Sequence, residues 1–261
     1  MPQSNKPPDK PSVAQFNPLD REPAYRQLAE AITGQILDGT LPPGFVLPIE
    51  QKLADQFNVH RSTLREGLRV LEQNGLVRRE GKKLIVQRPP HEGLARMMGR
   101  ALVLHDVTFQ DVHMMGQLLY STAAELAAIH ATDEIKDKLQ ANLARTRDVL
   151  NDPDDLTQVD LEFMQLIAQG SGNTALVLAL EPLGLIFYAV FHAIFEVVPV
   201  AGERLLASHQ KIFDSIVEGN SYDARRWMNK HCDDFLRGVE ASGFSPEVSV
   251  GSWDRVILRM S

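Results

Sequence analysis

Residues 50–75 read EQKLADQFNVHRSTLREGLRVLEQNG, and the spacing of their apolar side chains predicts two short helices. The first covers 50–57 and the second 61–74, with only three residues between them. Gly75 follows as a glycine should after the last turn of a helix. The second helix carries three leucines on one face: Leu64, Leu68 and Leu71. The stretch therefore predicts a helix-turn-helix.

The flanking sequence extends this unit in both directions. Leu28, Ile32 and Ile36 recur four apart and predict an earlier amphipathic helix over about 23–38. After Gly75, two short apolar runs surround the glycine-containing turn Glu80-Gly81-Lys82-Lys83 and predict a hairpin. The unit ends at Pro89-Pro90, where we place a domain boundary.

The whole chain divides into four parts. It has 261 residues, of which 44% are hydrophobic and 23% charged, a globular composition. Residues 1–22 hold five prolines and few large apolar side chains, so we expect a disordered tail. The helix-turn-helix unit occupies 23–89, a helical domain 91–241, and a C-terminal tail 242–261.

The helical domain is predicted to be an all-α antiparallel bundle, because short connections join successive helices. Proline, glycine and asparagine mark the breaks between them. The expected helices lie near 91–104, 108–130, 133–150, 155–169, 174–197, 202–218 and 221–241.

No segment predicts export or membrane insertion. The N-terminus lacks an apolar stretch, and the most apolar segment, 183–195, is shorter than the ~20 residues of a membrane helix. The single cysteine, Cys232, closes no internal disulfide and cannot build a multi-cysteine zinc module. We expect a cytoplasmic protein without a membrane partner.

Charge is unevenly distributed. The chain has 27 basic and 34 acidic residues, a formal charge of −7, which excludes a uniformly basic coat. Residues 45–90 hold nine basic and five acidic residues, so this segment carries +4 and the rest −11. A small cationic module on an anionic body is typical of a protein that contacts phosphates.

The cationic side chains of the second helix are expected to contact DNA. Arg61, Arg65 and Arg69 are spaced four apart, on a different arc from the leucines. An arginine fork bonds guanine or phosphate through two donors. Short hydroxyls at the helix start and lysines at the hairpin tip add further donors: Ser62, Thr63, Lys82 and Lys83. The alternative is an exposed helix whose arginines pair with Glu66 and Glu72.

These stretches resemble a known family. LPIEQKLA (47–54), VHRSTLREGL (59–68) and LEQNGLV (71–77) are similar to the winged helix of GntR-type transcriptional regulators. The resemblance, over about 23–88, implies DNA contacts by Arg61, Ser62, Thr63 and Arg65, with Gly81 at the wing tip. The family usually has Ser at positions 49 and 60, so Ile49 and His60 imply weaker helix caps.

The helical domain, over about 91–240, resembles the C-terminal effector domain of the FadR subgroup. The resemblance rests on AAELAA (123–128), DLEFM (160–164), SGN (171–173) and two later histidines. It implies a divalent metal such as zinc, nickel, manganese or iron. The implied ligands are Asp160, His209 and His231. Met164 stands where the family has a histidine ligand, and a thioether is a poor substitute. The alternative is a polar pocket without metal.

The same resemblance implies a small-molecule effector inside the bundle. The residues expected to contact it are Gln117, Asp160, Met164, His209 and His231. Gln117 stands where the family often has an arginine, so no charge-assisted fork can form there. An apolar wall is expected from Met114, Met115, Leu118, Phe163 and Met164, which favours a less anionic, more hydrophobic effector. The stripe Phe187, Phe191 and Phe195 is expected to be core or dimer packing.

The fold expected is mainly α, a winged helix-turn-helix domain followed by an all-α bundle. The function expected is a transcriptional regulator, with repression as the commoner sign, that binds a pseudo-palindromic double-stranded DNA operator as a homodimer. Two alternatives remain open: a metal-sensing regulator, and an enzyme with a centre of two histidines and one carboxylate.

Overall fold

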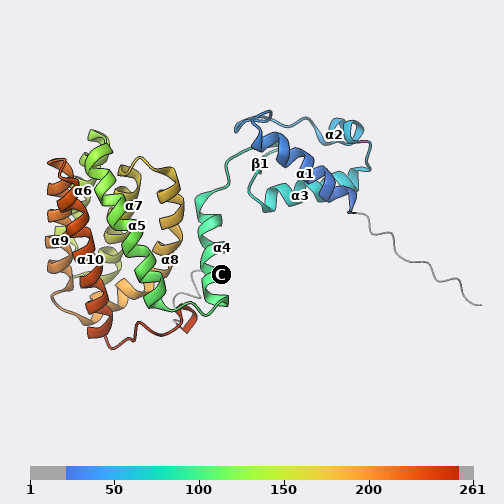
Figure 1. The fold of residues 1–261 in the computed structure, drawn as a ribbon. Coiled ribbons are helices and arrows are strands. Elements are labelled where there is room, and N and C mark those ends of the chain that lie inside the picture. The colour runs from blue at the N-terminus through green and yellow to red at the C-terminus, as the bar shows by residue number, and fades with distance from the viewer. Residues whose placement is uncertain (1–21, 253–261) are drawn as a thin grey trace, which may run out of the picture. The chain divides into compact units, whose positions relative to one another are not determined.

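The computed structural model describes residues 22–252, except for the side chains at 91, 92, 94, 185 and 189. The expected disorder of 1–22 concerns residues that lie, apart from 22, outside the described part, as do 253–261 of the C-terminal tail. The chain divides into two compact units, and the boundary in the sequence lies between Pro89 and Pro90. The predicted fold class is confirmed: a winged helix-turn-helix unit followed by a helical unit (Figure 1).

The first unit consists of three helices and a two-stranded hairpin. The helices are α1 (Ala24–Leu37), α2 (Glu50–Phe57) and α3 (Arg61–Gln73). The antiparallel strands are β1 (Val77–Glu80) and β2 (Lys83–Val86). Glu80 pairs with Lys83, so the turn between the strands is two residues long and shorter than the expected one. Gly81 occupies this turn with φ of 59°, a left-handed conformation that favours glycine.

The α3 leucines form the centre of this unit. Leu64, Leu68 and Leu71 are at most 1% exposed and pack with α1 and the hairpin. The helix ends in a Schellman motif: Leu76 N–H donates to the Leu71 carbonyl, and Gly75 N–H donates to the Glu72 carbonyl. Neither Ile49 nor His60 caps its helix through a side chain, which confirms the weak caps inferred from sequence.

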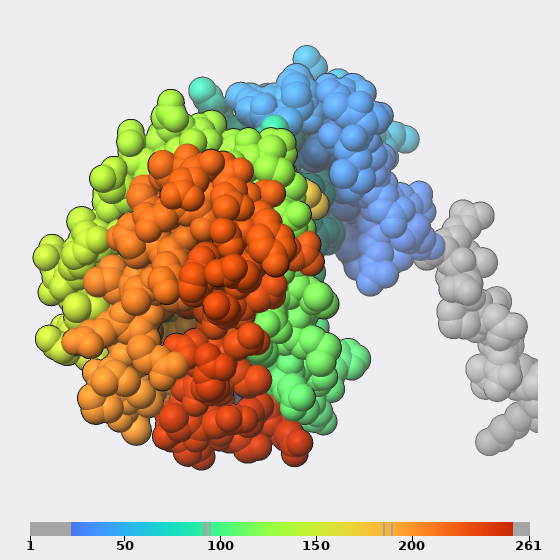
Figure 2. All heavy atoms as spheres, turned by 60° about the vertical axis from the view of Figure 1, so that its left-hand side comes forward, coloured from blue at the N-terminus to red at the C-terminus, as the bar shows by residue number. Residues whose placement is uncertain are grey.

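The second unit is a bundle of helices connected by short loops. It comprises α4 (His91–Leu104), α5 (Phe109–His130), α6 (Asp133–Asp148), α7 (Pro153–Gly170), α8 (Thr174–Val197), α9 (Ala201–Val217) and α10 (Ser221–Ala241). Five of these helices are capped at their N-termini by side-chain oxygens, those of Thr108, Thr132, Asp152, Asn173 and Asn220. In Figure 2, residues of α9 and α10 (orange to red) cover one face of this unit.

The central helix α5 packs against α7 and α10, and α8 packs against α4 and α7. The described start of the C-terminal tail is docked rather than loose. Ser249 pairs with Thr108, and Val250, in the short helix Val250–Ser252, is 1% exposed.

Helix α8 contains Pro182 and bends by 42° between Gly184 and Ile186. None of the helices in the described part is by itself long and apolar enough to cross a membrane. The two halves of α8 reach that length and composition only when they are taken together.

Candidate functional site

The first candidate site is the outer face of α3. Arg61, Arg65 and Arg69 are exposed, about a quarter turn around the helix from the buried leucines, and Ser62 is also exposed, whereas Thr63 is half-buried. Gly81 and Lys82 are exposed at the hairpin turn. The structure therefore places the three arginines on one exposed face of α3, Thr63 away from that face, and Gly81 and Lys82 at the wing tip.

The arginines of this face and of the adjoining hairpin differ in their ion pairs. Arg65 Nε donates to Glu50 Oε2 at 2.9 Å, and Arg79 Nη2 lies 3.6 Å from Glu50 Oε1. The Arg65 guanidinium, through this hydrogen bond, lowers the pKa of the Glu50 carboxyl group. Arg61 forms no ion pair with any described residue, so its charge is uncompensated locally.

The sequence did not predict this carboxylate network. Of the two carboxylates expected to pair with the α3 arginines, Glu66 does so, with its Oε1 atom 3.6 Å from Arg69 Nη1. Glu72 pairs instead with Arg79 of the hairpin. Glu50 belongs to a different helix, and no helical spacing relates it to residue 65. Because the pairs are half-exposed, each contributes little stability and yields readily to a phosphate.

The second candidate site is a buried polar cluster in the bundle. Asp160 of α7, His209 of α9 and His231 of α10 each offer a ligand atom, and these atoms lie within 4.8 Å of one another. Asp160 and His209 are both 0% exposed, and His231 is 5% exposed. The His209 ring stacks on Phe163 at 3.8 Å between centroids, which fixes its plane.

The polar atoms of this cluster are not satisfied by the described residues. Asp160 Oδ1 lies 3.2 Å from His209 Nε2, but the two groups lack the alignment of a hydrogen bond. Neither oxygen of Asp160 and neither ring nitrogen of His209 has a hydrogen-bond partner in the described part of the chain. Orphaned buried groups of this kind are costly, and one carboxylate with two imidazoles suits a divalent metal. The donor set therefore fits a metal ion.

Burial is the largest cause of the pKa shifts in the cluster. It raises the pKa of Asp160 to about 7 and lowers the pKa of His209 to about 3. It likewise lowers the pKa of His231 to about 4. The two imidazoles are thus neutral at pH 7, the form in which histidine binds metals.

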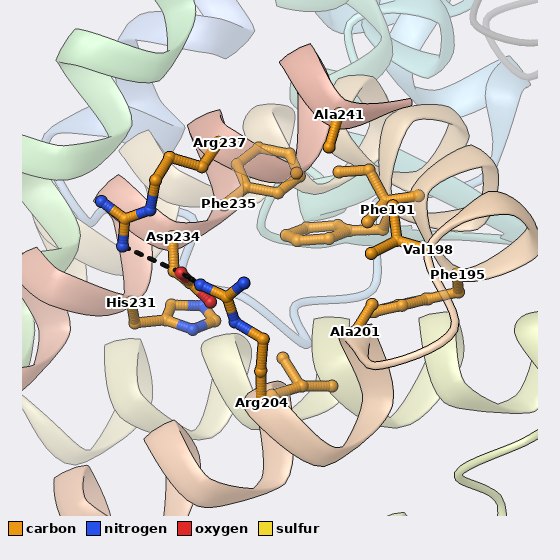
Figure 3. Close-up of a pocket in the computed structure, with 13 residues that line it drawn as sticks. Phe191, Phe195, Val198, Ala201, Arg204, His231, Asp234, Phe235, Arg237 and Ala241 are labelled. Atoms are coloured by element: carbon orange, nitrogen blue, oxygen red, sulfur yellow. Dashed lines mark hydrogen bonds and ion pairs between the residues drawn. The ribbon is translucent and has the colours of Figure 1, made fainter. Parts of the chain in front are cut away.

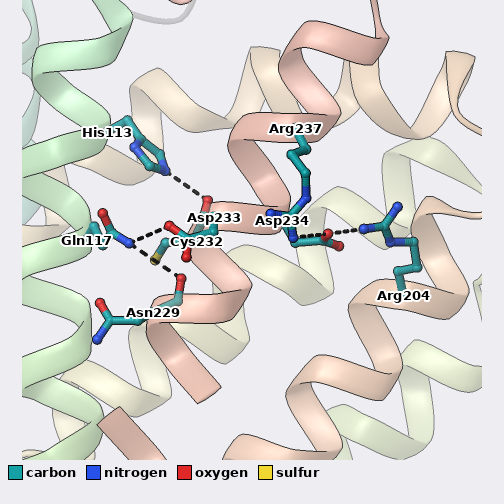
Figure 4. A network of polar contacts seen from close by, with 8 residues as sticks. All are labelled: His113, Gln117, Arg204, Asn229, Cys232, Asp233, Asp234 and Arg237. Atoms are coloured by element: carbon teal, nitrogen blue, oxygen red, sulfur yellow. Dashed lines mark hydrogen bonds and ion pairs between the residues drawn. The ribbon is translucent and has the colours of Figure 1, made fainter. Parts of the chain in front are cut away.

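The remaining predicted effector residues lie next to the cluster rather than in it. Met164 is 4% exposed and, with Gln117 and His231, lines a small cavity enclosed by α5, α7, α8 and α10. Gln117 is already engaged, because its amide nitrogen donates to Asp233 Oδ1 at 2.8 Å (Figure 4). In the same view, His113 Nε2 lies 2.9 Å from the Cys232 carbonyl oxygen.

Part of the expected apolar wall is wrong. Met114 and Leu118 are 56% and 63% exposed, because they lie on the face of α5 that points away from the core. Phe163 is buried as expected, and Phe187 and Phe191, both 5% exposed, belong to the core. The helical period shows which residues of α5 share a face, but it does not show which face is buried.

Two further cavities were not anticipated from sequence. One, of about 80 Å³, lies between α8, α9 and α10, with His231 in its wall (Figure 3). The other, of about 480 Å³, is bordered by α4, α5, α7 and α8, with Tyr120 and Met164 among its lining residues. Their walls come from segments far apart in the chain, so no local pattern indicated them.

Comparisons with known proteins agree with this architecture. Residues 24–85 match the family described as bacterial regulatory proteins, gntR family, and residues 111–234 match the FCD domain. An uncharacterized HTH-type transcriptional regulator of Mycobacterium tuberculosis is 31% identical over 68% of this chain and 71% of its own length. The Glc operon transcriptional activator of Escherichia coli is 27% identical over 81% of this chain and 87% of its own.

A solved structure is similar over most of this chain. The GntR protein of Streptococcus agalactiae superposes with a TM-score of 0.60 and 26% identity, over 82% of this chain and 99% of the other. The superposition therefore includes residues of both units.

Proposed function

The chain belongs to the GntR family of bacterial regulatory proteins, and from this premise we propose that it binds a pseudo-palindromic operator as a homodimer and controls a metabolic operon in response to a small-molecule effector. It is a DNA-binding transcriptional regulator with an FCD domain, and not an enzyme. A relative that activates the Glc operon supports control of metabolic genes.

The observation that carries the DNA-binding proposal is the division of α3 into two faces. Three arginines are exposed on one face, while the leucines of the other are at most 1% exposed. The buried face anchors the helix to α1 and the hairpin, so the arginines can enter a major groove without disturbing the core. Arg61 is free to take a phosphate, and Arg65 must exchange Glu50 for DNA.

A homodimer follows from the symmetry of such operators, because two copies of one helix read two half-sites in opposite orientation. We expect repression, since a dimer seated on a promoter excludes polymerase. The activating Glc relative has the opposite sign, and a promoter–reporter assay with and without the protein measures the sign here.

Fluorescence anisotropy with labelled promoter fragments, at several salt concentrations, tests the DNA contacts. Arg65→Ala should weaken operator binding by ~1–3 kcal/mol if Arg65 contacts a base through two donors. Arg61→Ala should weaken binding to all sequences and reduce the salt slope by about one phosphate contact. Arg226→Ala on α10 is the matched control, since it removes an exposed arginine from the other unit. Unchanged binding by both α3 variants would remove this face from the interface.

We further propose that Asp160, His209 and His231 hold a divalent metal. The support is the set of unpartnered buried donor atoms, which a cation would compensate. When bound, the ion would supply a fixed positive charge inside the bundle. The chain's own contribution is to hold two neutral imidazoles and one carboxylate together, with Phe163 fixing the plane of His209.

Elemental analysis of the purified protein, combined with operator binding with and without chelator, tests the metal and its role. Bound zinc, nickel or manganese that disappears in Asp160→Asn supports the site. Operator binding that changes when the metal alone is removed would favour a metal-sensing regulator. Metal-free protein that takes up no divalent ion would refute the metal proposal while leaving the DNA-binding proposal intact.

A further inference from the structure

The cavity between α8, α9 and α10 has two chemically different ends. Its inner wall is apolar, formed by aromatic and aliphatic side chains that include Phe191, Ile194 and Phe235. His231, which is 5% exposed, lies at the polar end of the cavity. At the same end, beside His231, Figure 3 shows Arg204 and Arg237 converging on Asp234. A ligand here would have to be apolar along most of its length and polar where it meets the arginines.

The two arginines at the charged end have more N–H donors than the Asp234 carboxylate accepts from. Arg237 Nη2 donates to Asp234 Oδ1 at 2.8 Å, and Arg204 Nη2 donates to the same oxygen (Figure 4). Two guanidinium groups against one carboxylate leave a local charge of +1. A guanidinium has five N–H donors, so both arginines retain donors for a second carboxylate. Their side chains are 52% and 61% exposed, so they can turn toward a ligand without losing core packing.

The volume limits the apolar part of the ligand. A cavity of 150 Å³ lined by aliphatic and aromatic side chains accommodates benzene. In proportion, the 80 Å³ found here accommodates about three or four carbon atoms. Gly238 keeps the helices close, because a Cβ at this position would lie 3.2 Å from the side chain of Ile194. The cavity is therefore too narrow for a long acyl chain.

We infer that this cavity binds a short-chain or branched aliphatic monocarboxylate, with the carboxylate on Arg204 and Arg237 and the alkyl part against the aromatic wall. The inference rests on the proposed function, because it names the chemical class of the effector. Asp234 competes with the ligand for the same donors and sets its affinity. Dicarboxylates and sugar acids are disfavoured, since a second polar group would be buried against Phe191 and Phe235.

Isothermal titration calorimetry of the full-length protein tests this site with isovalerate and pentanoate as probes. Acetate, which lacks the alkyl part, and isovaleramide, which lacks the charge, are the matched ligands. Isovalerate should bind at least tenfold more tightly than either. Equal binding of isovalerate and its amide, or no binding at millimolar concentration, would overturn the proposal.

Three variants give effects of different sign. The double variant Arg204→Gln/Arg237→Gln should weaken isovalerate at least tenfold, and Asp234→Asn should tighten it, because the competing carboxylate is gone. Ala201→Phe should block the cavity, whose wall includes Ala201. Arg226→Gln, also on α10 but outside the cavity, should change nothing. Isovalerate that binds equally to the double variant and to Asp234→Asn would refute the assignment.

Operator binding by the same preparations separates this inference from the proposed function. Intact operator binding without carboxylate binding refutes only the ligand class. A wild-type protein that binds no promoter fragment refutes the proposed function itself, whatever its carboxylate affinity.

Discussion

Replacing Asp160 by Asn should stabilise the metal-free protein at alkaline pH. The side chain is 0% exposed, and both carboxylate oxygens lack hydrogen-bond partners in the described structure. Burial raises its pKa from the ordinary 3.8 to about 7. The pKa of Asp160 is thus higher in the folded than in the unfolded protein. The folded protein therefore has its full stability below about pH 4, where the carboxyl group is protonated, and loses part of it as the pH rises to about 7. Each tenfold change in proton affinity equals about 1.4 kcal/mol, so the full loss is about 4 kcal/mol.

Thermal unfolding of the full-length protein in chelator measures this effect. At pH 8 the Asn variant should unfold at a higher temperature, by up to about 8–16 °C if a unit of this size shifts by about 2–4 °C per kcal/mol. At pH 5 the difference should fall to less than half, because much of the wild-type carboxyl group is then protonated. Asp137→Asn, at an exposed position of α6, is the control and should show neither effect.

Added divalent metal should reverse the sign. The wild type then gains the stability of the bound ion, whereas the Asn variant lacks the anionic ligand and gains little. An Asn variant less stable than the wild type in chelator at pH 8 would refute the reasoning, since it would show that the buried carboxylate is satisfied.

Three further outcomes are expected. Burial lowers the pKa of His209 to about 3 and that of His231 to about 4, and the loss of the Asp160 charge in Asp160→Asn removes an influence that raises the pKa of His231. In this variant without metal, stability should therefore be complete above about pH 6.5 and should fall as the pH drops below it. Urea unfolding from pH 7 to pH 5 measures this, and a flat profile contradicts it. Gly75→Ala should destabilise the winged-helix unit by about 1 kcal/mol in urea unfolding, because the backbone φ of 69° at this position disfavours a residue with a Cβ. Gly34→Ala, inside α1 and with open space around it, is the control and should be neutral or stabilising. Burial raises the pKa of Cys232 to about 12 and leaves the residue 6% exposed, so a thiol reagent should react with it only in denaturant; rapid reaction of the native protein would contradict this.

Local patterns predicted the helices well because each depends on nearby residues. The periodicity of Leu64, Leu68 and Leu71 located α3, and Gly75 located its end, since both features act within one or two helical turns. The hairpin was placed within one residue. The side of α5 that faces the core was predicted only in part. Met114 and Leu118 are apolar but exposed, because hydrophobicity alone does not determine which side of a helix contacts the core.

The resemblance brought Asp160, His209 and His231 together as a hypothesis, and the fold places them within 4.8 Å. It gave no indication that the cluster would have unpartnered oxygens and nitrogens. That property depends on every side chain around the cluster, including the stacked Phe163, and those neighbours come from different helices.

The order of elements, the cationic α3 and the division into two units were determined by the sequence itself, because helix periodicity, turn residues and charge are local properties of the chain. Only the tertiary structure decided that Glu50 holds Arg65 and Arg79, and that Arg204 and Arg237 share Asp234 beside an apolar cavity. Residues 15 and 30 positions apart meet there through helix packing, and ion pairs and cavities depend on distances in space that no sequence spacing specifies.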